Sequence, residues 1–198
     1  MCDMESTYTR YTYNEADGPA KGTLAEVLHH TYDYHPIQRI NYDYDNLGRN
    51  IKTVETRPSG AYETRTSYDE YSRVSQTVFP TGVTVNYEYR NGYLQTIKDE
   101  GNNVLWRTDK ANAYGQLVDA TLGNGTTTHR AYKEDMHYID SIVTSNNLQN
   151  LSYGYDKFGN FEARKDNLRN LEETFHYDKM NRLTDIYLGN THSQIVYD

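Results

Sequence analysis

The 198-residue chain has little of what usually builds or cross-links a compact domain: a single cysteine, one tryptophan and four phenylalanines. The lone Cys2 excludes an intrachain disulfide, so the fold must be stable without covalent cross-links. No window of about 18 apolar residues occurs, and the N-terminal MCDMESTYTR lacks a basic region followed by an apolar run. We therefore expect neither membrane insertion nor an export signal within this chain, and the chain's own localisation is unknown.

Positive charge is also scarce. Lys and Arg number 20 against 28 Asp and Glu, which gives a formal net charge of −8. Proteins that bind phosphate backbones cluster Lys and Arg on one surface. The balance excludes nucleic acid as the expected partner, and it disfavours heparin-like chains and anionic lipids as well.

Tyrosine is abundant where aliphatic residues are few. The chain holds 21 Tyr, and Tyr and Thr favour β-strands. Disordered segments are usually poor in aromatic residues. The composition therefore predicts an all-β protein that is solvated on at least one face.

A repeated motif organises the chain. The segments YDNLGRN (44–50), YDEYSRV (68–74), YDKFGNF (155–161) and YDKMNRL (177–183) share Tyr-Asp followed by Gly or a small polar residue three places after the Asp. Weaker copies start at Tyr89, Ala111 and Tyr132, and Tyr197 begins another, so the starts lie 20 to 24 residues apart. Such a fixed period is typical of repeat architectures.

Each repeat predicts a β-hairpin. Residues before the tyrosine alternate, as in Val83, Val85, Tyr87 and Tyr89, which is the pattern of a half-buried strand. The Asp can accept backbone amides in a turn, and the Gly can take positive φ. A second turn signal, such as Pro58-Ser59-Gly60, lies between consecutive motifs. Two turns per repeat predict about 14 to 16 strands in one antiparallel sheet.

The predicted sites are therefore structural positions of the repeat, with no catalytic or metal-binding residue among them. These positions are Tyr44, Asp45, Gly48, Arg49, Tyr68, Asp69, Arg73, Tyr89, Gly92, Gly115, Tyr132, Tyr155, Asp156, Gly159, Tyr177, Asp178 and Arg182.

The fit of the motif positions to the repeat spacing divides the chain into two regions. Residues 44–198 form a tandem array of about seven repeats, whereas residues 1–43 are irregular N-terminal repeats or an end segment. Within the latter, GTLAEVLHH (22–30) is expected to form a short helical turn.

Residues 44–183 resemble the Tyr-Asp repeats (YD repeats) of the Rhs family, which is shared with the C components of bacterial toxin complexes and with teneurins. YDNLGRN and YDKMNRL carry the resemblance best, together with the Asn-Gly turn of ATLGNGTTTHRAY (120–132). The resemblance implies tandem antiparallel β-hairpins in a continuous curled or spiralling sheet, a shell that encapsulates a C-terminal toxin or effector. It also implies a bacterial parent protein that is exported or displayed at the cell surface, with further repeats and a toxin domain as partners.

For each potentially reactive side chain, a structural role is the better prediction than a catalytic one. The Asp and Arg of the motif recur, whereas an active site is needed once, so turn capping and weak surface ion pairing account for them. His29, His30 and His35 beside Asp33 match no zinc spacing and are expected at the surface. The chain lacks a GxSxG nucleophile motif and a phosphate-binding loop. We expect a protein that is not an enzyme and needs no cofactor.

A carbohydrate- or cell-surface-binding module is the alternative function, because exposed tyrosine rings can stack on a glycan. The competing interpretation is that the rings pack on each other across neighbouring strands. A strip of sheet also has two open strand edges, which tend to pair with another chain. The sequence therefore predicts edge-to-edge self-association as well.

Overall fold

The computed structural model describes residues 7–31, 33 and 35–197, so Cys2 and Asp198 lie outside the described residues. The protein is all-β, and its 17 strands belong to one antiparallel sheet, which confirms the predicted fold class. The strands are β1 (Thr7–Tyr13), β2 (Leu24–Thr31), β3 (Pro36–Tyr44), β4 (Asn50–Arg57), β5 (Gly60–Tyr68), β6 (Val74–Val78), β7 (Thr84–Arg90), β8 (Tyr93–Asp99), β9 (Val104–Ala111), β10 (Leu117–Leu122), β11 (Thr127–Tyr132), β12 (Ile139–Thr144), β13 (Gln149–Tyr155), β14 (Phe161–Asp166), β15 (Leu171–Tyr177), β16 (Leu183–Leu188) and β17 (Thr191–Gln194).

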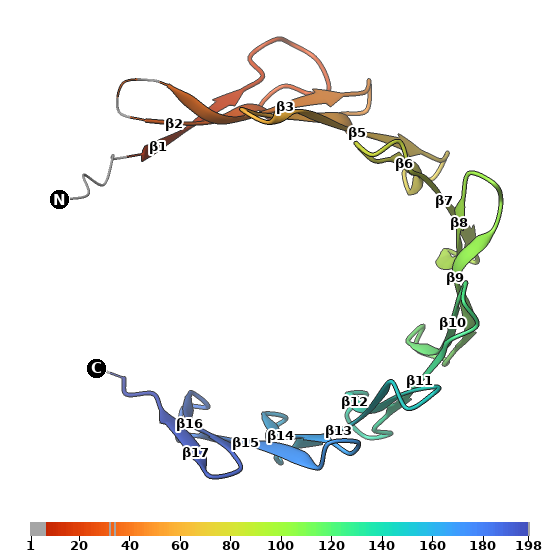
Figure 1. The fold of residues 1–198 in the computed structure, drawn as a ribbon, viewed down its shortest axis with the longest axis vertical. Helices are drawn as coiled ribbons and strands as arrows, with labels where there is room; N and C mark the ends of the chain where they lie inside the picture. Colours follow the sequence, from red (N-terminus) through yellow and green to blue (C-terminus); the bar gives the residue numbers. More distant parts are fainter. Residues whose placement is uncertain (1–6, 32, 34, 198) are drawn as a thin grey trace. The chain divides into compact units, whose positions relative to one another are not determined.

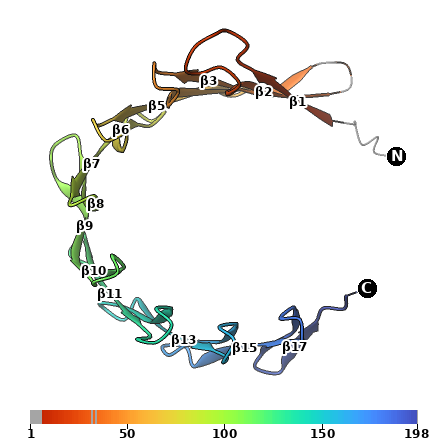
Figure 2. The same ribbon diagram turned by 180° about the vertical axis from the view of Figure 1, so that it is seen from behind.

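The chain divides into two units. Unit 1 comprises residues 1–88 and 97–103, and unit 2 comprises residues 89–96 and 104–198. In unit 1 each strand from β1 to β7 pairs with its neighbour in the chain, and in unit 2 the same holds from β9 to β17. Within each unit, Figures 1 and 2 show successive strands side by side in chain order.

The helical turn expected for residues 22–30 is wrong. Leu24–Thr31 is strand β2, which pairs with β1 on one side and with β3 on the other. An isolated helical turn is unstable in water, whereas the two ladders bond both sides of this backbone segment. Tertiary pairing therefore overrides the local helix preference.

Two kinds of turn alternate along the sheet. Because neighbouring strands are antiparallel, in each unit the turns that follow odd-numbered strands lie at one edge and the turns that follow even-numbered strands lie at the other. Within each unit the Tyr-Asp motifs occupy the first of these, which we call the Tyr-Asp edge of that unit. The opposite edge of each unit carries the turns that lie between consecutive Tyr-Asp motifs. These turns are at residues 58–59, 80–82, 100–102, 123–125, 146–147 and 189–190.

A β-bulge recurs immediately after the Tyr-Asp turns. Asp43 faces Lys52, but the next pair is Tyr44 with Asn50, so Ile51 has no counterpart on β3. The same shift occurs at Tyr68, Tyr132, Tyr155 and Tyr177. A bulge bends its strand and increases the local twist, so these hairpins share one local distortion as well as one turn.

The single layer of sheet leaves much surface uncovered. The chain exposes 13994 Å², whereas a compact monomer of 23.1 kDa is expected to expose about 9,700 Å². Among the described residues, the buried apolar side chains are Leu28, Val118 and Ala120. Hydrogen bonds and half-buried contacts, rather than a deep core, must therefore hold neighbouring hairpins together.

Candidate functional site: the Tyr-Asp turns

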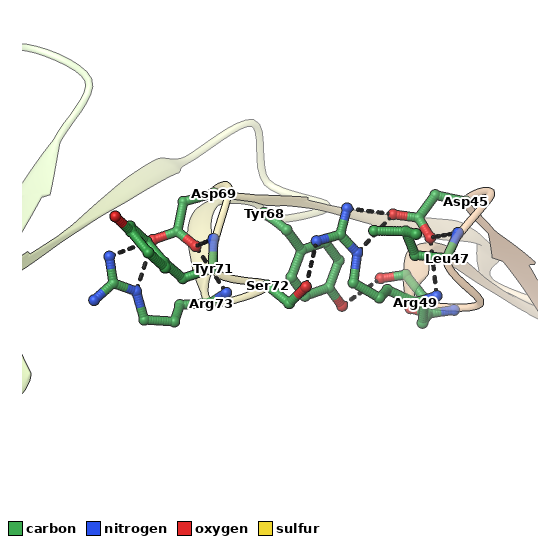
Figure 3. A network of polar contacts seen from close by, with 9 residues as sticks. Asp45, Leu47, Arg49, Tyr68, Asp69, Tyr71, Ser72 and Arg73 are labelled. Carbon is green, nitrogen blue, oxygen red and sulfur yellow. Dashed lines mark hydrogen bonds and ion pairs between the residues drawn. The ribbon is translucent and has the colours of Figure 1, made fainter. Parts of the chain in front are cut away.

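The turn at residues 45–49 shows how the motif works (Figure 3). The amide of Asp45 donates to the Arg49 carbonyl at 3.0 Å, and the amide of Gly48 donates to the Asp45 carbonyl at 3.0 Å. Gly48 has φ of 76°, which completes a three-residue hairpin loop with a left-handed third residue. The chain therefore reverses within five residues.

The Asp45 carboxylate holds this turn closed from inside. One oxygen, Oδ1, accepts hydrogen bonds from the backbone amides of Leu47 at 2.9 Å and Arg49 at 3.0 Å. The other, Oδ2, accepts a hydrogen bond from Arg49 Nε at 2.7 Å. The side chain thus binds backbone amides and also forms an ion pair. Asp69 with Arg73 and Asp178 with Arg182 repeat the arrangement, with Arg Nε to Asp Oδ2 distances of 2.7 Å.

These contacts change the acidity of the carboxyl groups. Partial burial raises the pKa of Asp45, but hydrogen bonds from Arg49 and from backbone amides outweigh it and hold the pKa below its ordinary value of 3.8. The same causes lower the pKa of Asp69. For Asp178 the backbone amide of Arg182 is the main cause of a lowered pKa. The aspartates therefore stay ionised in their turns.

Two repeats keep the turn without the Asp–Arg ion pair. In the Ala111 repeat, Asn112 stands where the Asp should be, and its Oδ1 accepts the amides of Tyr114 and Gln116 at 3.0 Å each. Its Nδ2 donates to Gln116 Oε1 at 2.8 Å, so a neutral pair replaces the ion pair. The repeat at 155 keeps Asp156 and replaces the arginine alone, so that Asn160 Nδ2 donates to Asp156 Oδ2 at 2.9 Å.

Two other repeats close differently. At Tyr89 the loop is shorter, and Asn91 and Gly92 both have positive φ, 51° and 83°, as a type I′ turn requires. At Tyr132 the loop is longer, and Lys133 Nζ binds Asp140 Oδ1 at 2.8 Å in place of an Asp cap. The predicted motif residues Tyr89, Gly92 and Tyr132 therefore lie at hairpin turns without the aspartate network.

The motif tyrosine bridges neighbouring hairpins through its hydroxyl group. The Tyr68 hydroxyl donates to the backbone carbonyl of Asn50, the first residue of β4, at 2.7 Å. Equivalent bonds join Tyr44 to Leu24, Tyr132 to Leu117, Tyr177 to Phe161 and Tyr197 to Leu183, at 2.6 to 2.9 Å. We call these contacts the tyrosine bridges.

Each tyrosine bridge lies where the strand ladder stops. The pairing of β4 with β5 ends at Lys52 opposite Arg65, two residues short of Asn50 and three short of Tyr68. The other four bridges have the same offsets. The side chain therefore bonds a carbonyl that lies beyond the ladder, next to the bulge. Because the acceptor is backbone, Asn50 can replace the apolar residue that usually follows the turn.

Successive Tyr-Asp turns also contact each other directly. Arg49 Nη1 donates to Ser72 Oγ of the next turn at 3.0 Å, and its guanidinium lies 4.6 Å from the Tyr68 ring centre. Figure 3 shows this reach from one turn to the next. In unit 2, Gln116 donates to the His137 carbonyl at 2.7 Å and Asn160 to Asn181 Oδ1 at 3.0 Å. In each case the acceptor residue has positive φ.

At two turns whose αL residue is glycine, an aromatic side chain takes over this contact. Tyr93 covers Gly115, whose added Cβ would lie 2.7 Å from the ring, and Tyr138 covers Gly159, whose added Cβ would lie 3.1 Å from the hydroxyl oxygen. Gly115 and Gly159 therefore serve twice, since they supply positive φ and admit the neighbouring ring. Sequence reasoning found these glycines from the turn but missed the second role.

Ring packing matches the sequence expectation only in places. Tyr138 and Tyr155 lie 4.9 Å apart, and Phe161 contacts Tyr155 and Phe175 in the same unit. Burial, as the largest cause, raises the pKa of Tyr155. Tyr44, Tyr68, Tyr132 and Tyr177 are half-buried and use their hydroxyls in the bridges. The rings most open to solvent are others, Tyr71, Tyr114 and Phe158.

The histidines give no metal centre in residues 7–31, 33 and 35–197, where no group of three or more His, Cys, Asp or Glu is arranged to hold an ion. His29 contacts Thr9 Oγ1 at 3.2 Å. The surface position expected for His30 is wrong: it is 6% exposed, and its Nδ1 lies 2.7 Å from the Thr31 carbonyl. Within the described part of the chain there is also no helix long and apolar enough to cross a membrane.

Comparison with known proteins identifies a fold. No protein-family model matches the chain, and no curated protein matches it. Among solved structures it resembles TcdB2-TccC3, with a TM-score of 0.60, and TcdB2-TccC3 without the hypervariable C-terminal region, with a TM-score of 0.61, both at 15% identity. It also resembles a Tc holotoxin pore structure from Photorhabdus luminescens, with a TM-score of 0.55 at 16% identity.

These matches cover 92% of this chain and 12% of each of the matched chains. At such low identity the likeness concerns the fold alone. The chain therefore shares the fold of a segment of these toxin-complex chains.

Proposed function

We propose that the chain is a non-catalytic scaffold: a segment of a YD-repeat shell of the Rhs type, whose wall encloses a C-terminal toxin or effector of its parent protein. The observation that carries this proposal is the set of tyrosine bridges and turn-to-turn contacts, which join neighbouring hairpins within each unit. A wall must be continuous, and these bonds extend the connection beyond the strand ladders.

The fold likeness supports the same proposal. The matched structures belong to multi-component toxin complexes, and the resemblance of residues 44–183 to YD repeats points to the wall of such an assembly. Because this chain spans only 12% of the matched chains, the remaining wall and the cargo would come from other parts of the parent protein.

Electrostatics supports a role without catalysis. A catalytic acid or base at neutral pH needs a pKa shifted toward neutrality. Here the shifts run the other way, since the pKa values of the turn aspartates are lowered. Hydrogen bonding to Asp140 raises the pKa of Lys133, and burial raises those of Tyr155 and Tyr177. Each group is held in its resting protonation state.

The glycan-binding alternative has weaker support. The motif tyrosines that suggested it are half-buried and their hydroxyls donate to backbone carbonyls. The exposed turn positions hold leucine and methionine as well as aromatic rings, and aliphatic side chains offer a sugar no flat stacking face.

Protease protection in the parent protein that carries this segment tests the proposal. We expect its C-terminal region to resist protease in the wild type and to be digested after Tyr44, Tyr68, Tyr132 and Tyr177 are changed to Phe, because the wall then opens more often. Changing the exposed Tyr71 and Tyr114 to Phe is the matched control. If the C-terminal region of the wild type were digested as fast as that of the bridge variant, encapsulation would be refuted.

A further inference from the structure

The chain contains two Asn-Gly pairs, Asn91-Gly92 and Asn124-Gly125, and all four residues are exposed at turns. Asparagine is a thermolabile residue, most of all before glycine, which has no Cβ to shield its own amide nitrogen. The two turns differ in what holds the reacting groups. The structure therefore predicts different chemical fates for the two asparagines.

In such a pair the glycine amide nitrogen can attack the asparagine side chain. A bond forms between this nitrogen and Cγ, the bond from Cγ to Nδ2 breaks, and Nδ2 leaves as ammonia with the proton of the attacking amide. The product is a five-membered succinimide ring. Water then opens the ring at one of its two carbonyl carbons. Opening at Cγ gives aspartate, whereas opening at the main-chain carbon gives isoaspartate, whose main chain runs through Cβ and Cγ.

Two hydrogen bonds hold the Asn124 pair away from this reaction. Asn124 Oδ1 accepts a hydrogen bond from the backbone amide of Thr126 at 3.0 Å. The amide of Gly125, which is the attacking group, donates to the Leu122 carbonyl at 2.9 Å. Thr126 is buried, so releasing its amide is costly. The ring can close only after both groups have left these partners.

The Asn91 pair lacks this restraint. Asn91 and Gly92 are the central residues of a type I′ turn, whose own hydrogen bond joins the two flanking residues and leaves the Gly92 amide out. Within residues 7–31, 33 and 35–197, neither the Asn91 side chain nor the Gly92 amide takes part in a hydrogen bond. A local fluctuation of this turn is therefore enough to bring the amide nitrogen to Cγ.

The residue after the Asn91 pair connects this turn to the next one in unit 2. Tyr93 covers Gly115, whose added Cβ would lie 2.7 Å from the ring. Conversion of Asn91 to isoaspartate lengthens the main chain by one carbon directly before Gly92. Tyr93 can then no longer keep its position over Gly115, so the turn at residues 112–116 loses its cover.

We propose that Asn91 is a site of spontaneous modification, which converts to aspartate and isoaspartate in the folded chain while Asn124 is protected, and that the isoaspartyl form frees the turn at 112–116 from Tyr93. The reaction consumes only water and needs no enzyme. It goes beyond the scaffold role, because a slow chemical change then loosens one turn-to-turn contact. Breaking two hydrogen bonds first should make the rate at Asn124 about tenfold lower or less.

Mass spectrometry of the full chain tests the difference between the two sites. The folded protein is incubated in mildly alkaline buffer, and a protease that cuts after glutamate then separates residues 89–100 from residues 101–134. Asn91 should convert about tenfold faster than Asn124, or more. In concentrated urea, where no turn is held, the two should convert at similar rates. Conversion of Asn124 as fast as Asn91 in the folded protein would overturn the proposal, and so would a difference that persists in urea.

Hydrogen exchange tests the effect on the neighbouring turn. As isoaspartate accumulates, which a protein isoaspartate methyltransferase measures, the amides of residues 112–117 should exchange faster than in fresh protein. The variant Asn91→Asp is the matched control, because it carries the charge of the product but keeps the length of the main chain, so its exchange should match that of fresh protein. Unchanged exchange in the isoaspartyl protein, or an equal rise in Asn91→Asp, would refute the link through Tyr93.

Discussion

Changing Tyr177 to Phe removes one hydroxyl group and leaves the ring, so it isolates the tyrosine bridge to the Phe161 carbonyl, whose length is 2.8 Å. A neutral intramolecular hydrogen bond contributes about 1 kcal/mol to stability. The ring of Tyr177 is half-buried. The freed carbonyl of Phe161 lies next to the bulge of β14 and loses this partner. The free energy of unfolding should therefore fall by about 1 kcal/mol.

The repeat multiplies this effect. Tyr44, Tyr68, Tyr132 and Tyr177 make equivalent bridges in separate repeats with different acceptors. Effects at separate sites without shared partners usually add, so the fourfold Phe variant should lose about 4 kcal/mol.

Urea unfolding measures the total loss, and hydrogen exchange of peptides covering β14 and β15 locates the loss at Tyr177. The control is Tyr114→Phe, because that ring is 67% exposed at a turn tip and makes no tyrosine bridge. If Tyr177→Phe and Tyr114→Phe changed stability equally, the bridge would not be what joins the hairpins. A fourfold variant as stable as the wild type would refute the reasoning altogether.

Three further outcomes follow from the turns. The variant Asp45→Asn/Arg49→Gln copies the natural Asn112–Gln116 pair, so it should lose less stability than the two single variants lose in sum; a double-mutant cycle of urea midpoints measures this, and strict additivity would contradict it. On acidification, the turn aspartates have folded pKa values below 3.8, so the folded state binds fewer protons than the unfolded state. Their stabilising effect is complete above the unfolded pKa and is lost as the pH falls through the folded pKa. The urea concentration at the unfolding midpoint should therefore decrease once the pH is below about 4. A midpoint that stays constant down to about pH 3 would be the contrary result. Gly125→Ala should cost about 1 to 2 kcal/mol for its positive φ alone, whereas Gly115→Ala should cost more because its Cβ would meet the Tyr93 ring at 2.7 Å; equal thermal shifts would argue against that ring contact.

The local structure followed from the sequence because it depends on neighbours in the chain. An Asp followed three places later by Gly bonds its own turn amides and accepts positive φ within five residues, as at Asp45 and Gly48. Fourteen strands follow Tyr44, within the predicted range. The prediction failed at residues 22–30, where pairing with β1 and β3 outweighed a local helical preference.

The sequence by itself determined the period, the hairpins and the edge at which each turn lies, since alternation and turn chemistry act over a few bonded residues. Only the tertiary structure decided what the motif side chains do between repeats. The bulge after Tyr44 and the register of β4 against β5 place the Tyr68 hydroxyl on the Asn50 carbonyl and Arg49 on Ser72. Those contacts join residues 18 and 23 positions apart, and which atoms meet depends on strand register, a property of the assembled sheet that no single repeat contains.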